Sequence, residues 1–419
     1  MKTFRGLVII GLAFFFTVSF LGTGYGVTIK GIKEFGTPHE PVLMEMAKKF
    51  KAETGIDVKY DVMPYLTFRE KMMVNLVGKV PEYDFIHFPG SMAGPVLSGG
   101  HLLPLEKFDK KYKFDLEDWI PSAWEKAHWK GKHLAMPFKE CGFVLFYRKD
   151  LFEKKGLKPP VTVKDYLKAA QALTDPPNMY GIALQAKQAV TTTWSWWDYL
   201  YAWGGDVFDK NWKPAFNTRE GEESLQFFID LINKYKVASP GSTTYSFDGA
   251  TSAMQTGKAA MVPNWWDQYI NFQDPKKSSV AGKVGMAVMP RNTRQMATTS
   301  CWAMGIPKAS RHPEEAYRWM EFVVRAENAN FFFDAGAYVG RASPYKDPEL
   351  LKKYPEIKTI FEAMAHGRYL PKIPEMIKVS DISSRYISKA IAGKMTVKEA
   401  LSGMEKEVDK IMREAGYYK

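Results

Sequence analysis

Apolar residues recur along this chain at two spacings, one typical of helices and one typical of strands. Four of them are spaced as one face of a helix: Leu43, Met46, Ala47 and Phe50. Gly55 is well placed to end that helix, because glycine readily adopts the left-handed conformation that follows many helix C-termini. Apolar and polar residues then alternate over 56–60, and a second short strand is predicted at 84–88, just before a Pro-Gly-Ser loop.

Short strands and helices keep alternating through the rest of the chain. Further strands are predicted at 181–184, 259–262, 284–289 and 302–306. A helix is predicted from Pro313 to Val324, with proline at an early helical position and acidic residues in the first turn. Thr396 and Glu399 form a capping-box pattern ahead of an amphipathic helix that Gly416 ends. This alternation predicts an α/β fold with mostly parallel sheets.

Length and composition indicate the number of domains and argue against a nucleic-acid partner. A chain of 419 residues is too long for one ordinary core and indicates two domains. Apolar residues make up 46% and charged residues 25%, which is ordinary for a globular protein. The formal charge is +12, but lysine and arginine are dispersed through amphipathic segments without a long basic run. We therefore expect no nucleic-acid partner.

The N-terminus has the three parts of a secretory signal peptide. Lys2 and Arg5 precede an uncharged apolar stretch over 7–21, and the small-x-small site Gly24-Tyr25-Gly26 follows. The apolar stretch is shorter than the roughly 20 residues that span a bilayer. Residues 1–26 are therefore expected to be removed near Gly26. With no cysteine near that site, the rest of the chain is expected to be free in the periplasm or outside the cell.

Two cysteines, Cys141 and Cys301, lie 160 residues apart. An oxidising compartment allows one disulfide between them. The alternative is two buried free thiols, and the sequence alone leaves both open.

Aromatic residues gather in two clusters. Six of them fall within ten residues: Trp194, Trp196, Trp197, Tyr199, Tyr201 and Trp203. The second cluster is the run Asn264-Trp265-Trp266-Asp267. One interpretation is core packing. The other is a binding site, because flat apolar faces beside carboxylates and amides suit a two-faced ligand such as a sugar ring.

Catalytic and cofactor motifs are missing from the sequence. It contains no GxSxG, HExxH, CxxC, P-loop, or GxGxxG after a strand, and its seven histidines show no close metal-ligand spacing. Acid pairs such as Glu222-Glu223 and Glu314-Glu315 stand at helix starts, where the helix dipole explains them. We therefore expect no cofactor and no metal, and a binding protein rather than an enzyme.

Six segments resemble a known family in that family's order. They are MAKKFKAETGIDVKYDVMP (46–64), YDFIHF with SGGHLLPLEKF (98–108), HLAMPFKECGFVLFYRKDLFEKKGL (133–157), FDGATSAMQTGKAAMVPNWW (247–266), GRASPYKDPELLKKYP (340–355) and GKMTVKEAL (393–401). Together they resemble the extracellular solute-binding proteins of ABC sugar importers, the family that includes maltose-binding protein. The resemblance covers essentially the whole chain after residue 26.

The resemblance implies a type II periplasmic-binding-protein fold. Each of its two lobes would be a mostly parallel sheet flanked by helices, with a ligand cleft between them. The N-terminal lobe would comprise 27–138 and 303–341, and the C-terminal lobe 139–302 and 342–419. The chain would cross between the lobes near 137–139, 300–303 and 340–343, which places both cysteines close to crossovers.

The resemblance also implies a set of ligand-binding residues. They are Glu34, His39, Phe88, Ser91, Glu140, Trp194, Trp197, Asp198, Trp265, Trp266, Asp267, Trp302 and Arg341. Trp194 and one of Trp265 and Trp266 would stack on the ligand, while the carboxylates would accept hydrogen bonds from its hydroxyls. Maltose-binding protein has Trp and Asp at the positions of Phe88 and Ser91, and a carboxylate at that of Cys141. These departures argue against a maltose-like ligand.

Each of these residues also has a purely structural interpretation. The tryptophans could be core, His39 a helix cap, Glu34 an exposed strand end, and Arg341 the partner of a structural acid. The favoured function is an importer's binding protein, a monomer that captures a sugar or polyol and delivers it to ABC permease subunits. The alternatives are the same fold binding a polyamine, an amino-acid-like or anionic solute or a metal complex, or a secreted carbohydrate-active enzyme. The enzyme would need two carboxylates facing each other across a cleft.

Overall fold

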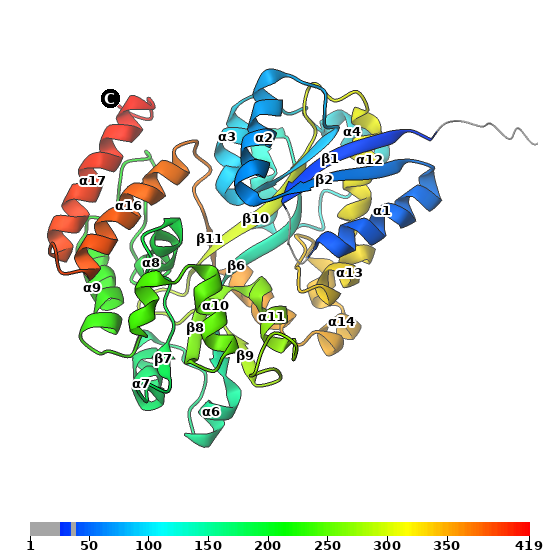
Figure 1. Ribbon diagram of the computed structural model, residues 1–419. Coiled ribbons are helices and arrows are strands. Elements are labelled where there is room, and N and C mark those ends of the chain that lie inside the picture. The colour runs from blue at the N-terminus through cyan, green and yellow to red at the C-terminus, as the bar shows by residue number, and fades with distance from the viewer. Residues whose placement is uncertain (1–25, 35–38) are drawn as a thin grey trace, which may run out of the picture.

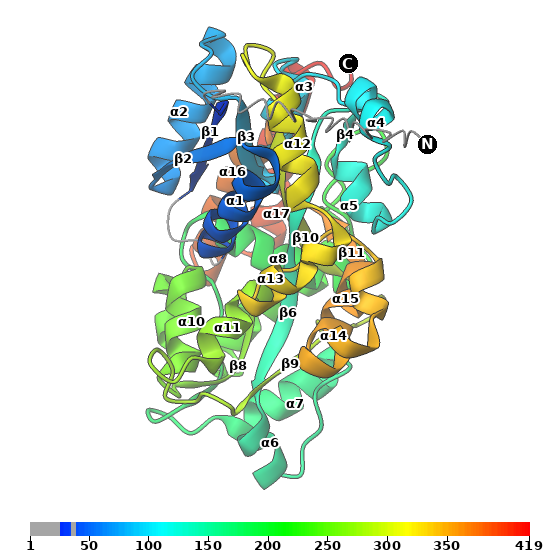
Figure 2. The same ribbon diagram turned by 90° about the vertical axis from the view of Figure 1, so that its right-hand side faces the viewer.

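A computed structural model describes residues 26–34 and 39–419 of the chain. The expected signal peptide, residues 1–26, lies outside the described residues except for its last position. The described chain forms two α/β lobes stacked one above the other (Figures 1 and 2). No helix in the described ranges has the length and apolar content to span a membrane.

Nine strands form one mixed sheet that continues through both lobes. Its main path is β2 (Asp57–Met63), β1 (Thr28–Glu34), β3 (Phe85–Pro89), β10 (Ala297–Gly305), β6 (Met136–Arg148), β8 (Ala259–Trp265) and β7 (Tyr180–Ile182). Off this path, β11 (Gly367–Tyr369) pairs with β10, and β9 (Val284–Ala287) pairs with β6. A separate two-stranded ladder joins β4 (His128–Trp129) and β5 (Lys132–His133).

Parallel pairing occurs toward the two ends of the sheet and antiparallel pairing in its middle. Strands β2, β1 and β3 are parallel in one lobe, and β7 and β8 are parallel in the other. Strand β10 runs antiparallel to both β3 and β6, and β6 runs antiparallel to β8. The α/β, two-lobed prediction is confirmed, with the refinement that one continuous mixed sheet replaces two separate parallel ones.

Helices flank the sheet in both lobes (Figure 1). Those packed around the upper lobe are α1 (Glu40–Thr54), α2 (Tyr65–Gly78), α3 (Ala93–Ser98), α4 (Glu106–Tyr112), α5 (Pro121–Lys126) and α12 (Pro313–Val323). As predicted, α1 buries Leu43, Met46, Ala47 and Phe50, and it ends at Gly55, whose φ of 74° is left-handed. Such a conformation is strained for a residue with a Cβ, which explains the glycine.

The remaining helices all come after β6 in the sequence. They are α6 (Lys149–Lys154), α7 (Val163–Leu173), α8 (Val190–Ala202), α9 (Arg219–Asn233), α10 (Phe247–Gln255), α11 (Tyr269–Gln273), α13 (Ala329–Asp334), α14 (Pro348–Lys353), α15 (Ile357–Ala365), α16 (Met376–Ile391) and α17 (Val397–Glu414). The capping box predicted for α17 is present: Thr396 and Glu399 exchange hydrogen bonds at its start. Its apolar face packs on α16 and α9.

Strands β6 and β10, here called the hinge strands, run through the region between the lobes (Figure 1). The first half of β6 pairs with β10, and the second half pairs with β8 and β9. Strand β10 pairs at one end with β3 and at the other with β11. The hinge strands therefore join the pairing networks of the two lobes through backbone hydrogen bonds.

The two cysteines are free and buried. Cys141 lies on β6 opposite Ser300, and Cys301 lies on β10 opposite Glu140. Successive side chains of a strand point to opposite faces, so the two sulfur atoms lie on opposite faces of the sheet. Strand register thus explains why these neighbouring residues stay thiols.

Candidate ligand-binding site between the lobes

The hinge strands present two different faces. Lys139 and Trp302 stand opposite each other in the pairing of β6 with β10, and so do Glu140 and Cys301. Because side chains alternate, the first pair marks one face, here called the front face, and the second pair marks the other, the back face. The predicted site residues divide between these faces and the lobe cores.

A buried ion pair lies on the front face. The Lys139 ammonium contacts a carboxylate oxygen of Asp267 at 2.6 Å, and the two side chains are only 4% and 12% exposed. Burial acts to lower the pKa of Lys139, but the nearby negative charges of Asp267 and Glu34 outweigh it and the pKa is raised. Burial raises the pKa of Glu34, against the attraction of Lys139 and Lys33. Glu34, from the end of β1, therefore lies close to the ion pair.

Aromatic rings border the ion pair on the side of the upper lobe. Trp302 is half-buried on β10, and its ring stacks on Phe68 of α2 with centroids 6.3 Å apart. The His39 ring lies 5.9 Å from that of Trp302 and 5.2 Å from that of Phe138. Burial and the neighbouring Lys139 and Lys33 charges hold the pKa of His39 well below its ordinary value, so the imidazole is neutral.

A second aromatic group belongs to the lower lobe. Trp194 of α8, Trp265 at the end of β8 and Phe247 of α10 contact one another, with centroid separations of 5.8 to 6.2 Å. The Trp194 indole donates a hydrogen bond to the Ser380 hydroxyl at 3.1 Å, which fixes the orientation of its ring. Trp194 and Trp265 keep 7% and 9% of their surface exposed, and Phe247 keeps more. We name these three rings the aromatic wall.

The structure separates the two adjacent tryptophans 265 and 266. Trp266 is fully buried, and its indole donates to the main-chain carbonyl of Glu140 at 3.0 Å. Its ring packs so closely on Gly142 that a Cβ there would lie 2.4 Å from it. Trp197 is also fully buried in the core. Of the tryptophans in the two clusters, Trp194 and Trp265 are those placed in the aromatic wall.

Two predicted carboxylates are buried away from the front-face ion pair. Asp198 of α8 accepts a hydrogen bond from the Thr298 main-chain N–H at 2.6 Å, which ties that helix to β10. Glu140 points to the back face, where the Tyr369 hydroxyl donates to it, and its own N–H donates to the Tyr338 carbonyl at 2.6 Å. Burial raises the pKa of each carboxyl to about 8.

These raised pKa values predict a pH-dependent stability. The ordinary values are 3.8 and 4.5, so the folded chain holds more protons than the unfolded chain between about pH 5 and pH 8. The free energy of unfolding is therefore expected to fall as pH rises through that window, by roughly 1 kcal/mol per pH unit for each carboxyl. Urea unfolding at several pH values measures this slope. Asp198→Asn and Glu140→Gln should each flatten it, and an unchanged slope in both variants would contradict the assignment.

Phe88 and Ser91 lie where β3 meets the first short turn after it. Phe88 is 1% exposed in an apolar cluster of the upper lobe with Ile32 and Met92. Ser91 is 6% exposed within the 3₁₀ turn Gly90–Met92, which packs against β10.

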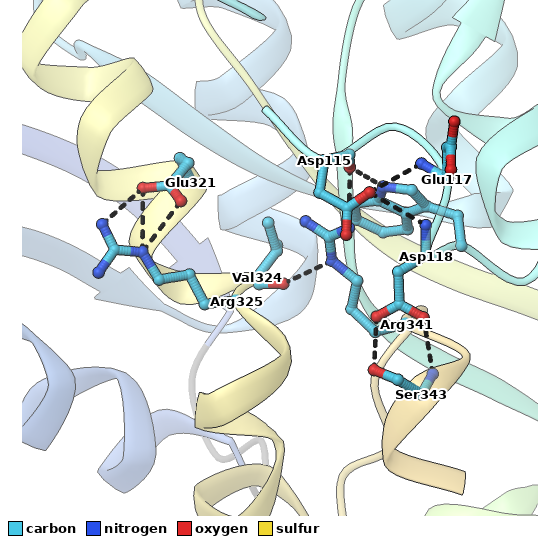
Figure 3. A network of polar contacts seen from close by, with 9 residues as sticks. Asp115, Glu117, Asp118, Glu321, Val324, Arg325, Arg341 and Ser343 are labelled. Carbon is cyan, nitrogen blue, oxygen red and sulfur yellow. Dashed lines mark hydrogen bonds and ion pairs between the residues drawn. The ribbon is translucent and has the colours of Figure 1, made fainter. Parts of the chain in front are cut away.

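Arg341 belongs to a polar network inside the upper lobe, as Figure 3 shows. Its guanidinium donates to the main-chain carbonyls of Val324 and Asp115, both at 2.9 Å. The guanidinium also lies over the rings of Trp119 and Phe114, 4.1 and 5.0 Å from their centroids. These contacts use the hydrogen-bonding groups of Arg341 within the protein. They favour the structural interpretation of Arg341 over the ligand-binding one.

Sequence comparison places the chain in a family. The family model for bacterial extracellular solute-binding proteins matches residues 36–330, well over half of the chain. The chain belongs to this family.

Individual relatives of this solute-binding protein match along nearly its full length. A probable amino-acid ABC transporter periplasmic-binding protein of Sinorhizobium fredii is 23% identical over 94% of this chain and 91% of its own. The mannitol-binding protein of Pseudomonas aeruginosa is 25% identical over 90% of this chain and 91% of its own. A solved solute-binding protein from Agrobacterium radiobacter, in complex with ribitol, is 30% identical and superposes with a TM-score of 0.81, covering 92% of this chain and 99% of that one.

Several residues near the front face of this solute-binding protein were absent from the predicted set. Lys139 is the most important, and its signal was a lysine inside the strand segment 136–146, whose only other charged residue is Glu140. Phe247 had no local signal. Partial burial raises the pKa of Asp381 on α16, and the positive charge of Arg69 on α2 acts against that rise. Among the described residues, no group of three or more acidic, histidine or cysteine side chains could hold a metal ion.

Proposed function

We propose that this chain is the exported binding subunit of an ABC importer that captures a sugar or polyol between its lobes. The observation that carries the proposal is the buried Lys139–Asp267 ion pair, with Trp302 opposite Lys139 on the hinge strands, in a solute-binding fold. Relatives whose names specify mannitol and ribitol support this ligand class. The closed, loaded protein would then dock on permease subunits, and we expect it to act as a monomer with no catalytic role and no nucleic-acid partner.

The chemistry of the front face suits a neutral polyhydroxylated ligand. The Asp267 oxygen that does not contact Lys139 is buried without a hydrogen-bond partner among the described residues. A ligand hydroxyl can donate to it, while another hydroxyl accepts from Lys139; such charge-assisted bonds are among the strongest neutral ligands can make. The faces of Trp265 and Trp302 would cover the apolar C–H surfaces of the ligand. Contacts from both lobes would favour the closed arrangement by differential affinity.

The lobe boundaries remain part of the proposal. We propose an upper lobe of 27–138 and 303–341 and a lower lobe of 139–302 and 342–419. The first boundary falls within β6 and the second within β10. We also propose cleavage of the signal peptide near Gly26, which would deliver the mature protein to the periplasm or the extracellular space.

A zwitterionic solute such as an amino acid is the second candidate. The paired charges of Lys139 and Asp267, with Glu34 nearby, could complement the carboxylate and the amino group of such a ligand. The name of the Sinorhizobium fredii relative specifies a probable amino-acid ABC transporter. The aromatic wall favours the sugar or polyol, because stacking surfaces add nothing specific to the recognition of a zwitterion's charges.

A thermal-shift panel on the mature protein tests the proposal. Sugars, polyols, amino acids and polyamines would be added separately at millimolar concentration. A ligand at 100 times its Kd stabilises the folded state by about 2.7 kcal/mol, which appears as a raised Tm. We expect sugars or polyols to raise the Tm and to be recovered unchanged. Stabilisation by amino acids or polyamines alone would refute the assigned ligand class.

A further inference from the structure

A cavity of about 390 Å³ lies between the lobes on the other side of the hinge strands. The upper lobe lines it with α5 and β4, and the lower lobe with β11 and the segments that follow α8 and β11. Figure 2 shows α5, β4 and β11 on the opposite side of β6 and β10 from α1 and α10. Tyr369 lines this cavity and bonds to Glu140 on the back face. The cavity is therefore distinct from the front-face site.

Two lysines that line this cavity form no ion pair with any described residue. Lys126 is only 6% exposed, yet its ammonium makes one long hydrogen bond, to the Leu370 carbonyl at 3.5 Å, and lies 4.3 Å from the Tyr369 ring centroid. Lys372 donates to the carbonyls of Glu125 and His128 at 2.9 and 3.0 Å. In the described part of the chain, neither lysine is within ion-pair distance of a carboxylate. A buried ammonium without an anion is costly, so its retention calls for an explanation.

The rest of the lining is also positive and aromatic. Besides Lys126 and Lys372, it includes Lys210 and Arg368, whereas its carboxylates are Glu125 and Asp209. Trp129, Tyr201, Trp212 and Tyr369 supply flat ring surfaces. Arg368 already pairs with Asp206 at 3.1 Å, so Lys126, Lys210 and Lys372 face the two carboxylates Glu125 and Asp209, and the lining keeps a net positive charge. A polyamine would meet an excess of like charge here, and a neutral solute would leave the buried ammonium unpaired.

We propose that this back cavity binds a small multivalent anion of the phosphate class, held by Lys126 and Lys372. Its volume falls in the range typical of small-molecule sites. Because both lobes contribute to the lining, a bound anion interacts differently with different lobe arrangements and so shifts their populations. Tyr369, which lines the cavity, donates a hydrogen bond to Glu140 on β6 and so connects the cavity to a hinge strand. The anion would thus act as an effector of lobe closure.

Inorganic phosphate and pyrophosphate serve as probes for this site. Each would be titrated calorimetrically into the mature protein at constant ionic strength, so that general screening stays fixed. We expect saturable binding of one anion per chain. Lys126→Met and Lys372→Gln should each weaken it by about tenfold or more, the loss expected for one charge-assisted hydrogen bond. Lys126→Met should not lower the Tm in phosphate-free buffer, because it removes an unpaired buried charge while keeping its volume.

Lys164→Met is the matched control. Lys164 is an exposed residue of α7 that makes no contact with this cavity, and its replacement changes the net charge equally. Binding that is absent, or that is weakened equally by all three substitutions, would overturn the proposal. The test involves no sugar and no front-face residue, so its outcome is independent of the proposed transport function.

Discussion

Replacing Asp267 with asparagine is expected to destabilise the protein and to abolish most of its ligand affinity. The substitution leaves Lys139 buried without its partner, which costs about 3–5 kcal/mol when a buried ion pair is broken from one side. The free energy of unfolding from urea titration should fall by that amount. The Kd of the sugar or polyol identified by thermal shift should rise by about 10- to 100-fold, because one charge-assisted hydrogen bond is lost.

A double variant separates the two effects. Lys139→Met combined with Asp267→Asn removes both charges, so no isolated ammonium remains in the interior and most of the stability should return. Ligand binding should stay weak, because neither partner of the ion pair can contact the hydroxyls. Wild-type affinity in Asp267→Asn would exclude this ion pair from the binding site. Loss of stability in the double variant as large as in the single one would show that packing, rather than charge, determines the effect.

Replacing Arg341 with alanine is expected to have the opposite profile, with a large effect on stability and none on affinity. The substitution removes two hydrogen bonds to main-chain carbonyls and the contacts of the guanidinium with the rings of Trp119 and Phe114. We expect the free energy of unfolding to fall by about 3–5 kcal/mol, since hydrogen bonds to a charged group and a buried cation–π contact are lost together. Calorimetric titration of the folded variant should give the wild-type Kd.

Arg325 provides the control for this prediction, and Figure 3 shows it near Arg341. It pairs with Glu321 at 2.9 Å one helical turn away, and its side chain is 37% exposed. Arg325→Ala should change the free energy of unfolding by less than about 1 kcal/mol, as for other exposed ion pairs. A Kd that rises strongly in Arg341→Ala but not in Arg325→Ala would return Arg341 to the ligand-binding set.

Local patterns made much of the fold predictable. The apolar face of α1, the glycine after it and the capping box of α17 all arise from interactions between residues a few positions apart. The mixture of parallel and antiparallel pairing in the sheet could not be predicted from the sequence, because strand direction depends on how distant segments of the chain meet. The alternation of short strands with helices favours parallel pairing, but β10 returns between β3 and β6 in the opposite direction.

The candidate site depends even more than the sheet on contacts between residues that are far apart in the sequence. Aromatic clustering nominated Trp194 and one of Trp265 and Trp266, and only the path of β8 shows that Trp266 is the one buried against the hinge strand. Lys139 and Asp267 are 128 positions apart, and no local pattern joins a lysine in one strand to an acid after another. The sequence left a disulfide and two buried free thiols open for Cys141 and Cys301, and the alternation of side chains on β6 and β10 keeps the two thiols apart.

The pairing of the two hinge strands has a mechanical consequence. Because β6 and β10 remain hydrogen-bonded to each other from Met136 to Gly142, the connection between the lobes is a two-stranded ribbon rather than two independent single strands. A ribbon bends far more easily out of its plane than within it, so the lobes are confined to a single swinging motion, as in other hinge closures. Opening on one side of the ribbon must then narrow the other, and a single interlobe distance followed by fluorescence would describe the whole motion.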